Sequence, residues 1–257
     1  MSNKIIAVAG PLGAGKTTWI CQNFMLQAPE SMLYFCPGTD SVPIDSTYMA
    51  AEYPGVQILA EGQDMERLKH VSGSETVYVE IGFHLQLSSL EAVLTSLPCT
   101  RIAILPPGME QTEWHAWADT IAVGAASQAM LNPSQLWRSP LTGQVLDPAS
   151  LDMFWYELTK GAYGQVQRAK GIFDLTDGRA FHFNFVAGLL QMETTELKLP
   201  RWLKGRPDRF SGIEVVGENL DQSAIAQTLK DCGLEDRAIA YYQQQVKDVL
   251  ASGAEAA

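Results

Sequence analysis

The sequence predicts an α/β protein with two domains: a first domain with a mostly parallel sheet flanked by helices, and a smaller C-terminal α+β domain. Two observations carry this prediction. In the first half, short apolar segments alternate with segments of helical spacing, which is typical of parallel strands joined by right-handed helical crossovers. Beyond residue 132 the strand-like segments become longer, and the chain closes with two amphipathic segments. We therefore expect domains at 1–135 and 165–257, with 136–164 as the connection.

In the first domain, apolar runs bounded by turn residues predict strands at 4–9, 32–36, 56–59, 76–79, 101–105 and 121–123. Between them, apolar residues recur at helical spacing and predict helices at 18–27, 45–53, 65–71 and 87–97. Proline cannot continue a helix, so Pro29 and Pro98 are expected to end the first and the last of these helices.

The second domain is predicted from a change of pattern. Turn signals such as Ser139-Pro140 and Asp147-Pro148 fill the connection. Strand-like runs follow at 166–175, 181–186 and 213–216, and in the second of them phenylalanines alternate with polar residues, as in a half-buried strand. Residues 221–251 are expected to form two helices, the first of them capped by Asp221.

Composition excludes several classes of function. The net charge of −11 argues against a surface for nucleic acid or for an anionic membrane. No segment approaches the roughly 18 uninterrupted apolar residues of a membrane span, so we expect no membrane insertion. The four cysteines show no C-x-x-C spacing, and the N-terminus enters a strand directly without a signal peptide, so we expect a cytoplasmic protein with unpaired thiols.

The most informative segment is residues 10–17, which read GPLGAGKT and match the phosphate-binding pattern G-x-x-x-x-G-K-[ST]. It lies between a predicted strand and a predicted helix, where such a loop must lie. Glycines let backbone N–H groups surround an anion, and the following helix directs its positive end at the same anion. Lys16 is expected to reach the β- and γ-phosphates and Thr17 to ligate Mg²⁺. The segment therefore predicts a P-loop NTPase domain that binds a nucleoside triphosphate.

Acidic residues near the expected loop are candidates for Mg²⁺ binding or for positioning water. Glu80 ends a predicted buried strand, where P-loop proteins place a carboxylate near the cation. A solvated carboxylate at a strand end is the alternative. Asp40 and Asp45 lie in the region that follows the second strand. Asp45 is equally consistent with the N-cap of the helix that begins there.

In these motifs the chain resembles the CobW-like (cobalamin-synthesis-protein) family of P-loop GTPases. Residues 10–18 agree throughout with the family's G-x-x-G-[AS]-G-K-T-T, and Ile44-Asp45 stands where the family has Ile-Asp after its switch loop. Residues 168–171 resemble the R-x-K-G strand that opens the family's C-terminal domain. The resemblance implies a nucleotide-hydrolysing switch in metal-cofactor delivery or in assembly of a metalloprotein, with a protein client on the C-terminal domain. The nucleotide-binding residues are then Gly10, Gly13, Ala14, Gly15, Lys16, Thr17, Thr18 and Ser127.

Two departures from the family pattern qualify that expectation. Residues 63–66 have no thiol where the family has C-x-C-C, so no transition-metal site made of protein ligands alone is expected. Residues 124–127 read Gly-Ala-Ala-Ser where the family has Asn-Lys-x-Asp. Ser127 is a poor bidentate acceptor for the guanine N–H groups, so either GTP or ATP, with Mg²⁺, fits the site.

Three functions remain open from the sequence. The first is an NTPase switch in which Lys16, Glu80, Asp40 and Asp45 form the catalytic group. The second is a small-molecule kinase, although the sequence offers no arginine-rich lid. The third is a non-catalytic assembly factor that nucleotide only stabilises, which the altered base motif favours.

Overall fold

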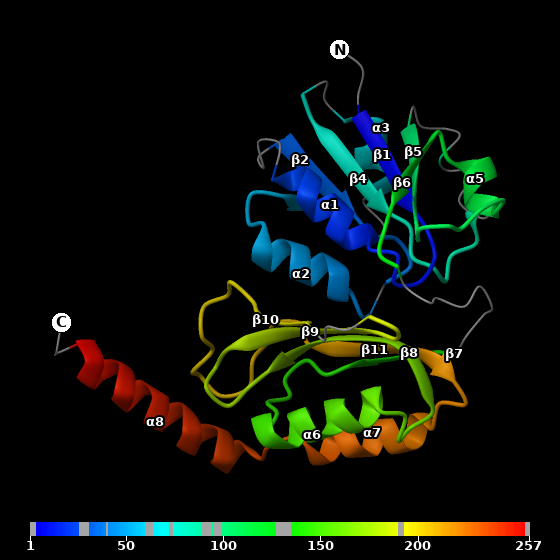
Figure 1. The fold of residues 1–257 in the computed structure, drawn as a ribbon. Helices are drawn as coiled ribbons and strands as arrows, with labels where there is room; N and C mark the ends of the chain where they lie inside the picture. The colour runs from blue at the N-terminus through cyan, green and yellow to red at the C-terminus, as the bar shows by residue number, and fades with distance from the viewer. Residues whose placement is uncertain are drawn as a thin grey trace. The chain divides into compact units, whose positions relative to one another are not determined.

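The computed structural model describes residues 4–25, 31–39, 41–59, 64–71, 74–88, 94, 99–126, 135–189 and 193–254. The chain divides into two compact units, Met1–Pro133 and Ser134–Ala257. Each unit has its own sheet (Figure 1).

The first unit is built on a six-stranded sheet with the order β3-β2-β4-β1-β5-β6. Every neighbouring pair of strands is parallel. This confirms the predicted α/β class, because parallel neighbours require crossover connections, which helices supply. The strands are β1 (Lys4–Ala9), β2 (Met32–Phe35), β3 (Gln57–Ile58), β4 (Thr76–Glu80), β5 (Cys99–Leu105) and β6 (Thr120–Val123).

The helices of the first unit cover both faces of its sheet. Helices α1 (Lys16–Phe24) and α2 (Ile44–Glu52) pack on the face that carries Ile6, Val8 and Tyr34. On the opposite face, residues of α3 (Asp64–Lys69) and α5 (Glu113–Trp117) pack against the alternate side chains of the same strands. Strands that are buried on both faces read as continuous apolar runs, which is why the sequence indicated them so clearly.

The second unit has an antiparallel sheet with the order β10-β9-β8-β11-β7. Its strands are β7 (Gln135–Pro140), β8 (Gln165–Asp174), β9 (Ala180–Val186), β10 (Glu193–Glu196) and β11 (Gly212–Glu218). Helices α6 (Pro148–Thr159) and α7 (Gln222–Asp231) lie side by side on one face, and α8 (Asp236–Ala254) ends the described chain (Figure 1). Phe154 and Trp155 of α6 pack with Phe173 and Phe183 of the sheet in the unit's core.

Residues 136–164 differ from the expected connection, because they supply β7 and α6 to the second unit. The prolines that suggested turns lie instead at the end of a strand and at the start of a helix. Pro140 ends β7, which pairs only with β11 and is therefore an edge strand, where proline is tolerated. Asp147 is the N-cap of α6 and Pro148 its first residue, and both are favoured at a helix start.

Smaller differences concern short elements. The sequence prediction did not include α5 or β10, and it placed the start of β5 two residues too late. Most of the helix expected at 87–97 lies outside the described residues. Within the described part of the chain, no helix combines the length and the apolar character needed to cross a lipid bilayer.

Candidate nucleotide site

The loop between β1 and α1 has the backbone shape that its glycines predict. Gly13 and Gly15 have positive φ angles of 71° and 90°, and Gly15 is the N-cap of α1. Gly10 (φ 150°) passes so close to β5 that a Cβ there would lie 2.2 Å from the carbonyl oxygen of Ile104. Only glycine combines these angles with this approach. The loop therefore turns tightly at the N-terminus of a nine-residue helix, where unpaired N–H groups favour an anion.

Lys16 is the first residue of α1, and its side chain folds back into the loop. Its Nζ donates hydrogen bonds to the carbonyl oxygens of Gly10 at 2.9 Å and Pro11 at 3.1 Å, and the residue is 5% exposed. A buried ammonium is costly unless it is paired, so this position requires acceptors. The cation is thus held within the same turn that the helix N-terminus faces, an arrangement that fits a phosphate.

Thr17 and Glu80 are brought together as the site prediction requires. The hydroxyl of Thr17 donates to Glu80 Oε1 at 2.8 Å, joining the first turn of α1 to the end of β4. The second carboxylate oxygen, Oε2, accepts from the hydroxyl of Tyr34 on β2, also at 2.8 Å. Glu80 is 4% exposed, so it is not the solvated strand-end carboxylate that the sequence left open.

The carboxyl group of Glu80 is buried and lies near that of Asp45. Burial raises the pKa of Glu80, and the charge of nearby Asp45 raises it further, while Lys16 and the two hydrogen bonds lower it. Asp45 is 8% exposed and lies in the first turn of α2, whose N-cap is Pro43, so the alternative of an Asp45 N-cap is wrong. Two close carboxylates and a hydroxyl are hard oxygen donors of the kind that Mg²⁺ prefers, and Thr17 and Glu80 would hold it.

The segment after β6 contacts the phosphate loop directly, which the sequence prediction missed. The backbone N–H of Ala125 donates to the carbonyl oxygen of Ala14 at 2.9 Å. A Cβ on Gly124 would lie 2.2 Å from the same oxygen and 2.7 Å from a side-chain carbon of Ile104. The glycine at position 124 could have indicated this contact. Where another backbone approaches a strand end closely, there is no room for a side chain.

Two of the remaining predicted site residues lie outside the described part of the chain, and a third is exposed. Asp40 and Ser127 lie outside the described residues. Thr18, in α1, is exposed. His84 bridges the segments after β2 and β4, because its Nε2 lies 3.1 Å from the carbonyl oxygen of Gly38 and its ring packs on Gly82. This bridge was not predicted from the sequence.

No group of three or more His, Cys, Asp or Glu residues with metal-binding geometry occurs among the described residues. The thiols of Cys21 and Cys232 are buried, and burial raises the pKa of each to about 11. A protonated thiol is a poor metal ligand and a poor nucleophile. These two cysteines are therefore packing residues.

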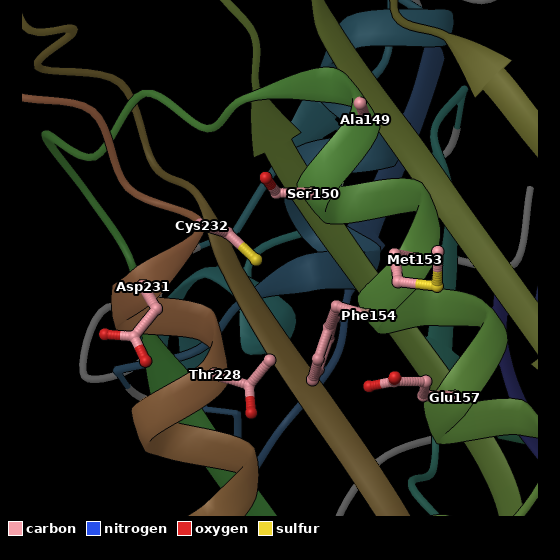
Figure 2. A pocket seen from close by; sticks show the side chains of 8 residues that line it. All are labelled: Ala149, Ser150, Met153, Phe154, Glu157, Thr228, Asp231 and Cys232. Atoms are coloured by element: carbon pink, nitrogen blue, oxygen red, sulfur yellow. The ribbon is translucent and has the colours of Figure 1, made fainter.

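The second unit has a groove of about 400 Å³ between α6 and α7, and Cys232 lines it from the C-terminal end of α7 (Figure 2). Met153 and Phe154 give it an apolar wall, while Glu157 and Asp231 place carboxylates at its edge (Figure 2). Glu157 accepts from the hydroxyl of Tyr163, which also lies 3.2 Å from the hydroxyl of Thr228 on α7.

Comparison with known proteins finds a family match within the second unit. Residues 142–233 match the family model of the cobalamin synthesis protein cobW C-terminal domain. No curated protein matches the chain. Among solved structures, the chain is similar to the crystal structure of the Zn(II)-bound YjiA GTPase from E. coli, with 12% identity, a TM-score of 0.31, and coverage of 90% of this chain and 99% of that chain.

A Zn(II)-bound triple mutant of the same GTPase gives 12% identity, a TM-score of 0.32 and the same coverage. These TM-scores are too low to support any conclusion about ligands or metals. The family match is independent of them, and it covers α6, β8, β9, β10, β11 and α7 of the second unit. Over residues 142–233, the chain is therefore similar to the C-terminal domain of the cobalamin synthesis protein cobW.

Proposed function

We propose that the chain binds a nucleoside triphosphate with Mg²⁺ in the first unit, hydrolyses it, and thereby acts as a switch in metal-cofactor delivery or in assembly of a metalloprotein. The observation that carries the proposal is the hydrogen bond between Thr17 and Glu80, beside a loop that holds Lys16 at a helix N-terminus. A glycine turn that arose by chance would not be expected to bring a cation, a hydroxyl and a buried carboxylate together.

The described residues suggest a division of roles. The loop N–H groups and the start of α1 would bind the phosphates, and Lys16 would move from its carbonyl partners to the β- and γ-phosphates. Because the hydroxyl of Thr17 donates its hydrogen bond to Glu80, its oxygen lone pairs would be available to a cation. Mg²⁺ would supply charge neutralisation for the phosphates when bound. Asp45 adds negative potential that would favour the cation and orient its water shell.

Base selectivity should be weak. A carboxylate is the usual partner of the guanine N–H groups, and residues 124–126 offer none. We therefore expect GTP and ATP to compete with affinities within roughly tenfold, or about 1.4 kcal/mol. Release of phosphate from either nucleotide without an added acceptor, dependent on Mg²⁺, would support the switch.

The same assay separates the alternatives. Tight binding without turnover would support a non-catalytic assembly factor, which the absence of an acidic base reader in residues 124–126 favours as the second candidate. Transfer that requires an acceptor would support a kinase. A GTP preference of a thousandfold would contradict weak base selectivity and would assign the base contact to another residue.

We further propose that a protein client binds the CobW C-terminal domain, because the described residues of that domain offer no constellation for chemistry of their own. Client binding can respond to nucleotide only if its free energy differs between the triphosphate and diphosphate states. Co-purification of a client with the tagged chain should therefore change between these states. Full, nucleotide-dependent binding by residues 1–133 alone would contradict this role of the second unit.

A further inference from the structure

A buried tyrosine hydroxyl contacts the carboxylate that the proposed function requires. Tyr34 lies on β2, is fully buried, and belongs to the apolar cluster between the sheet and helices α1 and α2. Phenylalanine would fill the same space without a polar atom, whereas a buried tyrosine hydroxyl requires a hydrogen-bond partner. The partner here is Glu80 Oε2, at 2.8 Å.

The sheet register explains why this side chain reaches the site. Tyr34 pairs with Tyr78 on β4, and Glu80 is two residues further along β4 on the same face. Neighbouring strands lie about 4.8 Å apart and rise about 3.3 Å per residue, so such diagonal neighbours are about 8 Å apart at the backbone, within reach of an aromatic side chain. The ring of Tyr34 therefore spans from its own strand to the end of β4, where Thr17 also meets Glu80.

The two hydrogen bonds fix the orientation of Glu80. Thr17 donates to Oε1 and Tyr34 donates to Oε2, so each oxygen has its own donor from a different element. A carboxylate held at both oxygens cannot rotate about its terminal bond without breaking one of these hydrogen bonds. While it is held, the proton of the Thr17 hydroxyl points to Glu80 and its lone pairs point elsewhere.

We propose that Tyr34 is a positioning residue for the cation site: it holds Glu80 in the orientation in which the Thr17 hydroxyl presents its oxygen to the Mg²⁺ of a bound nucleotide. This rests on the proposed function, since it assigns a role within that same site. Tyr34 contacts neither nucleotide nor cation and acts through Glu80. Its removal should therefore change the dependence of nucleotide affinity on Mg²⁺ and leave phosphate binding by the loop unchanged.

The test is the affinity of the full chain for a fluorescent GTP analogue, measured across a Mg²⁺ titration and again in EDTA. For Tyr34→Phe we expect the half-maximal Mg²⁺ concentration to rise about tenfold, the factor that corresponds to loss of one hydrogen bond to a charged group. Affinity in EDTA should stay within about twofold of the parent. In a Glu80→Gln background, Tyr34→Phe should have little further effect, because the two residues act as one unit.

Tyr53→Phe is the matched control. It removes a hydroxyl that packs against the same apolar cluster but bonds the thiol of Cys21 instead of Glu80. It should leave the Mg²⁺ titration unchanged. The proposal is overturned if Tyr34→Phe matches the parent, if the two tyrosine variants shift equally, or if Tyr34→Phe weakens binding as much in EDTA as in Mg²⁺.

Failure of the proposed function itself has a different signature. A parent chain that binds no triphosphate, or whose affinity ignores Mg²⁺, overturns the nucleotide and cation assignments before any variant is compared. A parent with a clear Mg²⁺ dependence that Tyr34→Phe retains overturns only the role of Tyr34.

Discussion

Replacing Lys16 with alanine is expected to lower the affinity for nucleoside triphosphate by about a hundredfold or more, because charge-assisted hydrogen bonds to phosphate are among the strongest a side chain makes. Among the described residues, Lys16 is the cation that the phosphate loop itself encloses. The fold should survive. The carbonyl oxygens of Gly10 and Pro11 lose a partner, which should cost about 1–3 kcal/mol of unfolding free energy.

Equilibrium binding of a fluorescent triphosphate, with circular dichroism to check the fold, measures both effects. Lys247→Ala on α8 is the control, because it removes an exposed lysine in the second unit. It should bind as the parent does. If Lys16→Ala bound triphosphate as tightly as the parent, the loop would be a structural turn and the proposed function would fail.

Gly124→Ala should damage both stability and nucleotide binding, although residue 124 matches no phosphate-binding motif. The new Cβ would lie 2.2 Å from the carbonyl oxygen of Ala14, which no real contact permits, so one of the two backbones must move. The movement would strain the hydrogen bond from Ala125 to Ala14 and displace the phosphate loop. Overpacking of this kind costs about 1–3 kcal/mol, and we expect a loss near the upper end with weaker triphosphate binding.

Gly108→Ala is the matched comparison for that variant. Gly108 has a positive φ of 77° but nothing within 4 Å of a new Cβ, so the substitution adds backbone strain of about 1 kcal/mol without a clash. It should lower the melting temperature slightly and leave nucleotide affinity intact. Equal effects of the two substitutions on affinity would show that the contact between Gly124 and the phosphate loop has no functional weight.

The elements that the sequence predicted well are those fixed by local chemistry. The strand 4–9 is buried on both faces and reads as one apolar run, and the glycines of the loop that follows must supply positive φ angles. The pairing of Thr17 with Glu80 was also predictable, because the phosphate-loop pattern and a strand-end carboxylate each have a known place in such a sheet.

What the sequence did not predict depends on partners distant along the chain. Asp147-Pro148 favours a turn and a helix start equally, and only the packing of α6 on the second sheet selects the helix. The role of Tyr34 could not be predicted, because a tyrosine in an apolar strand gives the same sequence pattern as a phenylalanine. Only the register of β2 with β4 shows that its hydroxyl reaches Glu80. Gly124 was hidden because the close approach of Ala14 is a tertiary contact.

The most direct test of the central claim is a calorimetric titration of the full chain with GTP and with ATP, each in Mg²⁺ and in EDTA. We predict one binding site per chain for at least one triphosphate, tighter binding in Mg²⁺ than in EDTA, and no saturable binding by Lys16→Ala under the same conditions. Absence of saturable heat for both triphosphates up to about 1 mM, where even a weak site of −4 kcal/mol would begin to fill, would contradict a nucleotide site at this loop.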